Sequence, residues 1–153
     1  MLALNENIKK LRMARGLNQV EFAKTLGVDF VITDHHECHG DLPEAASVVN
    51  PRRPDCEYPF KELAGVGVVF KLISAYEERF SSKSRKEAAL SVFYQYADLV
   101  AIGTIADVMP IKEENRLIVS YGLKKIEKAP RTGIMALMEA SSGRNDAQRQ
   151  NFK

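Results

Sequence analysis

Apolar residues recur every three or four positions through most of the chain, which is the spacing of amphipathic helices. This pattern predicts a short helix over residues 5–15, which Gly16 ends. Asn18 and Glu21 form an Asn-x-x-Glu capping signal, so a second helix is predicted over 19–26. Two short helices therefore precede the first β-branched run of the chain.

Two short segments replace the helical pattern with β-branched residues. Residues 29–33 read Asp-Phe-Val-Ile-Thr, a run typical of a buried strand, and we expect this strand to be central in its sheet. The segment 37–59 is rich in proline and charged residues and is predicted to be mostly loop, with a short strand near 47–49.

The second half of the chain is predicted to be largely helical. Helices are predicted over 60–80, from Ser84 to about Tyr96, 115–128 and 132–141. The apolar segment ADLVAIGTIADVMP, residues 97–110, predicts a strand or strand–turn that ends at Asp107. Helices alternating with apolar strands favour an α/β fold with a mostly parallel sheet flanked by helices.

Polar side chains with metal-binding chemistry follow the predicted strands. Parallel sheets place ligands at the carboxyl ends of their strands, where Asp34, His35, His36 and Asp107 are expected. Imidazole and carboxylate ligands together suit Mn²⁺, Fe²⁺ or Zn²⁺, and sites richer in carboxylates favour Mn²⁺ or Mg²⁺. The competing interpretation is a surface or capped core histidine pair, which is commoner than a catalytic one. His39 is interpreted as a loop residue.

Composition and charge narrow the function classes. The net charge of +2 predicts no nucleic-acid partner by itself, although the first 28 residues hold five basic and two acidic side chains. Cys38 and Cys56 form no CxxC pattern, so neither a disulfide framework nor a structural zinc site is indicated. No apolar stretch reaches the roughly 18 residues of a membrane span, which predicts a cytoplasmic protein without a membrane partner.

A family resemblance gives this pattern a specific meaning. TDHHE, residues 33–37, follows a β-branched strand as in the signature of the DHH phosphoesterase superfamily. Residues 48–72, 98–126 and 131–143 resemble successive segments of its RecJ branch, the single-stranded-DNA-specific exonucleases, and the resemblance covers roughly 23–153. It implies a phosphodiesterase of DNA repair and recombination that uses Mn²⁺ or Mg²⁺ and acts on single-stranded DNA.

The resemblance also implies residue roles. His35 would be a metal ligand, and His36 would position the scissile phosphate or the attacking water. Asp34 would be a ligand or an orienting carboxylate, and Asp107 would be the ligand of the family's fourth motif. The metal would lower the pKa of bound water and neutralise phosphoryl oxygens.

Two further pairs are candidates for DNA contact. Arg52 and Arg53 could bind phosphates, although a pair of loop arginines is more often simply solvated. Gly65 and Gly67 could let backbone amides approach a phosphate, although close helix–sheet packing explains glycines in a helical pattern as well.

The sequence also departs from the family. Two earlier aspartate-rich motifs supply most of the family's metal-site carboxylates, yet the first 28 residues contain no aspartate. We therefore expect a partial domain over 29–153, holding the third and fourth motifs only and inactive alone. A sheet without its first strands would expose an edge, through which the chain could self-associate.

The first 28 residues resemble another family. IKKLRMARGLNQVEFAKTLGV, residues 8–28, is similar to the opening of a Cro/C1-type helix-turn-helix regulator, but a predicted strand replaces the recognition helix. A partial helix-turn-helix segment over 1–28, joined to the DHH part at a junction, is the resulting domain hypothesis. The alternative functions are a DNA-binding regulator fused to a DHH remnant, and a metal-binding or structural α/β module.

Overall fold

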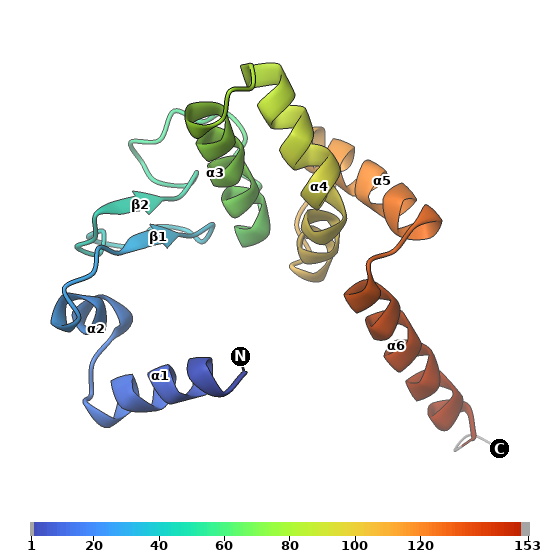
Figure 1. The fold of residues 1–153 in the computed structure, drawn as a ribbon, viewed down its shortest axis with the longest axis horizontal. Coiled ribbons are helices and arrows are strands. Elements are labelled where there is room, and N and C mark those ends of the chain that lie inside the picture. The colour runs from blue at the N-terminus through green and yellow to red at the C-terminus, as the bar shows by residue number, and fades with distance from the viewer. Residues whose placement is uncertain (1, 151–153) are drawn as a thin grey trace. The chain divides into compact units, whose positions relative to one another are not determined.

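The computed structural model describes residues 2–150, with side chains over 7–142, as helices and one small sheet (Figure 1). The chain divides into two compact units, one up to Lys61 and the other from Glu62 on. The first contains α1 (Leu2–Ala14), α2 (Gln19–Thr25), β1 (Val31–Thr33) and β2 (Ser47–Val49). The second contains α3 (Gly65–Phe80), α4 (Arg85–Ala106), α5 (Glu113–Lys128) and α6 (Thr132–Gln150).

The two N-terminal helices confirm the predicted pattern. Asn18 caps α2 because its Oδ1 accepts a hydrogen bond from the Glu21 amide at 2.9 Å, and Glu21 Oε2 accepts one from the Asn18 amide at 2.8 Å. Gly27, with φ of +63°, follows the end of α2 in the left-handed conformation that glycine adopts without strain.

The sheet of the first unit is parallel, as predicted, but small. Ile32 of β1 pairs with Val48 of β2, and Asp34 donates its amide to the Val49 carbonyl at 3.0 Å just beyond β1. The prediction of a central, buried strand is wrong: in the part of the chain that the structure describes, β1 has a single partner, and Val31 is half exposed. A β-branched run indicates a strand, but it carries no information on how many strands lie beside it.

The second unit is built around α4, which packs against both α3 and α5. Its core contains Phe70 from α3, Val92, Ala97 and Val100 from α4, and Ile118 from α5. The predicted helices over 115–128 and 132–141 are confirmed, and so is the Ser84–Glu87 capping box at the start of α4. The prediction of a partial α/β fold preceded by two short helices is therefore confirmed.

The predicted strand over 97–110 is wrong, because α4 continues as a helix to Ala106 and Asp107 is its C-cap. A helix covered on two sides is apolar almost all round, so its sequence loses the polar face that marks helical periodicity. By length and composition α4 is also the one helix among the described residues that could cross a membrane. A helix in the core of a protein can have the same length and composition, and 39% of the apolar 18-residue stretch of α4 is buried.

Close packing of α4 on α5 depends on Gly122. A Cβ atom added there would lie 2.5 Å from the Ala101 Cβ and would overlap the backbone carbonyl of Ala97. We expect Gly122→Ala to lower the free energy of unfolding by about 2 kcal/mol, because overpacking against backbone costs about 3 kcal/mol while the gain in helix propensity is about 1 kcal/mol. Gly133→Ala, in α6 with no atom within 4 Å of the added Cβ, is the control. Equal stability of the two variants in urea denaturation would contradict this packing.

Candidate metal centre

The DHH triplet lies where the chain leaves β1. The Oδ1 of Asp34 accepts hydrogen bonds from the amides of His35 at 2.7 Å and His36 at 3.2 Å. An aspartate that binds the next two amides in this way turns the backbone sharply. Both histidines are consequently held beside the carboxylate.

The His36 ring is fixed by the same carboxylate oxygen. Its Nδ1 lies 2.7 Å from Asp34 Oδ1, so Nδ1 carries the proton in the neutral ring and donates it, and Nε2 keeps the lone pair. The side chain is 74% exposed. A carboxylate that binds one ring nitrogen and leaves the other as a donor atom is the usual arrangement behind a metal-binding histidine.

His35 completes a compact donor group. Its side chain is 16% exposed, its Nδ1 lies 3.9 Å from Asp34 Oδ1, and its ring centroid is 4.2 Å from that of His36. One ligand atom from each of Asp34, His35 and His36 lies within 4.8 Å of the other two. A carboxylate with two imidazoles fits a divalent transition metal, so the three residues could hold one.

The electrostatics of Asp34 suit a cation. Burial by itself raises the pKa of its carboxyl, but the hydrogen bonds from the His36 ring and from the two histidine amides outweigh burial, and the pKa is lowered. The carboxylate is therefore ionised at neutral pH, as a metal ligand must be.

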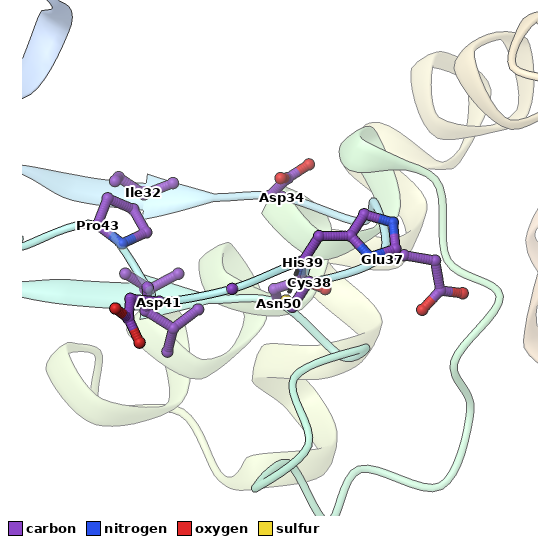
Figure 2. Close-up of a pocket in the computed structure, with 11 residues that line it drawn as sticks. Ile32, Asp34, Glu37, Cys38, His39, Asp41, Pro43 and Asn50 are labelled. Carbon is purple, nitrogen blue, oxygen red and sulfur yellow. Dashed lines mark hydrogen bonds between the residues drawn. The ribbon is translucent and has the colours of Figure 1, made fainter.

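A cavity of about 180 Å³ adjoins this group in the first unit. In Figure 2, Ile32 and Asp34 line the β1 side of the cavity, and Cys38, His39 and Asn50 lie across from them. His39 lies in the loop after the DHH triplet, which confirms its assignment as a loop residue. The site thus has an open volume beside the Asp34 carboxylate.

Asp107 is placed at a helix end and not at a strand end. It caps α4 in the second unit, where its amide donates to the Gly103 carbonyl at 3.0 Å. His35 belongs to the first unit and Asp107 to the second, and their proximity stays a prediction.

The two arginines of the loop after β2 are engaged with carboxylates. Arg52 pairs with Glu37, while Arg53 pairs with Asp55 and donates from Nη1 to the Val48 carbonyl at 2.5 Å. These contacts tie the loop together. A DNA phosphate would therefore compete with these carboxylates for the two guanidinium groups.

The two candidate glycines lie in the first turn of α3. A Cβ atom added to Gly67 would lie 3.1 Å from Leu63 Cδ2, which is a tight contact. This supports close packing as the reason for Gly67, with the preceding Leu63 as the neighbour instead of a sheet. Gly65 begins the helix after Ala64, which makes no side-chain cap.

Asn50 is a site residue that the sequence reasoning missed. It follows β2 directly and is only 5% exposed, yet its side chain reaches the backbone of the DHH turn. The rule that singled out Asp34, a polar residue at the carboxyl end of a parallel strand, applies equally to Asn50.

Comparison with known proteins identifies the family. The model of the DHH family, N-terminal domain, matches residues 6–104, a span that includes much of the segment resembling a helix-turn-helix. The single-stranded-DNA-specific exonuclease RecJ of Bacillus subtilis is 42% identical over 127 residues, which is 83% of this chain and 15% of that protein. RecJ of Escherichia coli is 38% identical over 134 residues, 85% of this chain and 23% of that protein.

A putative single-strand DNA-specific exonuclease of Bacillus phage SPbeta is 33% identical over 102 residues, 66% of this chain and 16% of that protein. The chain thus spans less than a quarter of the length of these curated relatives. No solved structure matches it significantly. The family match over more than half of its residues shows that the chain belongs to the DHH family.

Proposed function

We propose that this chain is a portion of a metal-dependent phosphodiesterase that acts on single-stranded DNA, in the manner of the 5′-to-3′ RecJ exonucleases of DNA repair and recombination. The observation that carries the proposal is the Asp34–His35–His36 donor group at the end of β1, in a chain of the DHH family. Relatives named single-stranded-DNA-specific exonucleases supply the substrate class. The cytoplasm is the compartment that fits a role in DNA repair and recombination.

In this proposal Asp34 and His35 hold a divalent cation, and Asp107 supplies a further carboxylate. The bound ion would supply Lewis-acid chemistry, activating water and neutralising phosphoryl oxygens. Mn²⁺ is favoured over Mg²⁺ because imidazole is among the ligands. The ionised Asp34 carboxylate and the largely buried His35 ring are consistent with this assignment.

His36 is the residue proposed to meet the phosphate or the attacking water. Its ring is largely exposed while its Nδ1 is fixed on Asp34, so Nε2 can act on a neighbouring group without reorienting the ring. Asp34 thus has two roles, as a ligand and as the group that orients His36.

DNA contact beyond the metal group is proposed at two places. Arg52 and Arg53 would exchange their carboxylate partners for DNA phosphates. The backbone amides around Gly65 and Gly67 would approach the sugar–phosphate backbone of the DNA strand. The helix-turn-helix alternative receives no support from the chain order, because β1 follows α2 where a recognition helix would stand.

Replacement of His35 is the direct test of the metal site. We expect wild-type protein to bind Mn²⁺ and His35→Ala to lose this binding, because the variant removes one of three donors that lie within 4.8 Å of each other. His39→Ala, which changes a loop histidine outside that group, should bind as wild type does. Equal Mn²⁺ uptake by wild type and His35→Ala in titration calorimetry would reject the site.

A further inference from the structure

The side chain of Asn50 links the end of β2 to the turn that carries the two histidines. Its Nδ2 donates to the His36 carbonyl at 2.9 Å and to the Cys38 Sγ at 3.4 Å. Its Oδ1 accepts from the Arg52 amide at 2.9 Å. One carboxamide thus binds both loops that leave the carboxyl end of the sheet.

These bonds begin where the ladder between the strands stops. The last backbone bond joins the Asp34 amide to the Val49 carbonyl, and Asn50 is the first residue after β2. Its side chain takes the place of a further ladder bond and binds the backbone of the DHH turn two residues beyond Asp34. Because Asn50 is 5% exposed, water cannot readily replace these bonds when they are lost.

We propose that Asn50 is a positioning residue of the metal centre, which fixes the His36 backbone and thereby holds His35 and His36 beside Asp34. This inference rests on the proposed function for the ion, but the contacts stand without it. Asp34 already fixes the turn from inside through its Oδ1. Asn50 fixes the same turn from the end of β2, so Asp34 and Asn50 together determine where the two imidazole rings lie.

Loss of the carboxamide should loosen the metal-binding group without removing a ligand. With the His36 carbonyl unbound, the turn can rotate and the donor atoms of the triplet can spread beyond the 4.8 Å that they now span. Replacement of outer residues that orient metal ligands typically weakens metal binding by about 10- to 100-fold. We expect Asn50→Ala to weaken Mn²⁺ binding by about tenfold or more.

The control is another asparagine of the same unit. Asn18→Ala removes the capping box of α2, which destabilises the first unit without touching the metal centre. Mn²⁺ binding is then measured by titration calorimetry at a temperature where circular dichroism shows that every variant is folded. Under these conditions, weaker binding reports misplaced histidines and not an unfolded chain. Asn50→Asp is the second variant, since it keeps the size of the side chain and its acceptor for Arg52 but loses both donated bonds.

A metal-free measurement tests the same anchor. Cys38 accepts a hydrogen bond from Asn50, so its alkylation by iodoacetamide should become faster in Asn50→Ala relative to Cys56, with peptide mass spectrometry separating the two thiols. Asn18→Ala should leave the ratio of the two rates unchanged. Should wild type bind no Mn²⁺, the proposed function fails, and the thiol ratio alone decides the role of Asn50.

Weakened Mn²⁺ binding together with a raised Cys38 rate in Asn50→Ala, both absent in Asn18→Ala, is the expected result. Wild-type Mn²⁺ affinity and an unchanged thiol ratio in Asn50→Ala would overturn the inference. If Asn50→Ala does not fold, Asn50→Asp decides by the same two measurements. If Asn50→Asp binds Mn²⁺ as tightly as wild type or more tightly, and its thiol ratio is unchanged, the inference is likewise overturned.

Discussion

Purified by itself, this chain is expected to hydrolyse single-stranded DNA at least about a thousandfold more slowly than a complete two-metal phosphodiesterase. Two ions need several carboxylates, and Asp34 and Asp107 are the two that the family resemblance assigns to the site. The first 28 residues contain no aspartate that could add to them. A deficit of about 4 kcal/mol in transition-state charge stabilisation corresponds to a thousandfold in rate.

The measurement is turnover of a 5′-labelled single-stranded oligonucleotide in excess Mn²⁺. Asp107→Ala is the informative comparison, since it removes the carboxylate assigned to the fourth motif. Robust degradation that Asp107→Ala eliminates would contradict the expectation and show that other groups supply the missing carboxylates.

The second large effect concerns Asp98, a carboxylate buried in α4 with 1% of its side chain exposed. Arg131 Nε donates to its Oδ2 at 2.6 Å, and Lys125 Nζ donates to its Oδ1 at 3.1 Å. Lys125 also donates to the Tyr94 carbonyl at 2.8 Å, and Arg131 to that of Gln95. This cluster joins α4 to the end of α5 and to the turn before α6.

Asp98→Ala should lower the free energy of unfolding of the second unit by about 3 kcal/mol, because removing one member of a buried ion cluster leaves the others uncompensated. The value lies at the lower end of the usual range since Lys125 and Arg131 keep some contact with water. Urea denaturation followed by circular dichroism gives the difference. A loss below about 1 kcal/mol, the usual value of a surface pair, would contradict the role assigned to the cluster.

The same cluster makes stability depend on pH. Burial raises the pKa of Asp98, but the hydrogen bonds from Arg131 and Lys125 outweigh it, so the pKa is lowered in the folded state. Its stabilising contribution is therefore complete above the ordinary aspartate pKa of about 3.9 and is lost as the pH falls through the lowered value. Denaturation at stepped pH should show this acid loss in wild type and a smaller one in Asp98→Asn. Parallel profiles would contradict it.

Local signals in the sequence were sufficient for the elements that depend on neighbours in the chain. The capping boxes at Asn18 and Ser84 each involve residues within a few positions of one another. Spacing and residue type therefore identify them. Asp34, His35 and His36 are also consecutive, so their placement together at the end of β1 could be predicted, while their roles in metal binding stay a proposal.

Features set by tertiary packing could not be predicted in this way. Burial between α3 and α5 makes α4 apolar on most sides, so its second half resembles a strand. The three residues of β1 do not indicate how many strands lie beside it in the sheet. His36 and Cys38, which accept from Asn50, lie 14 and 12 positions away in the chain, and Lys125 and Arg131, which donate to Asp98, lie 27 and 33 positions away, beyond any local pattern.

The position of bound Mn²⁺ decides whether the DHH turn is a metal centre. Mn²⁺ broadens the NMR signals of nearby nuclei, so a titration with substoichiometric Mn²⁺ on ¹⁵N-labelled protein locates the ion residue by residue. We predict that the amide signals of Asp34, His35 and His36 and their sequence neighbours broaden first, and that His35→Ala removes this effect. Broadening that begins instead at an exposed acidic position such as Glu113, with the DHH turn unaffected, would contradict the proposed metal centre.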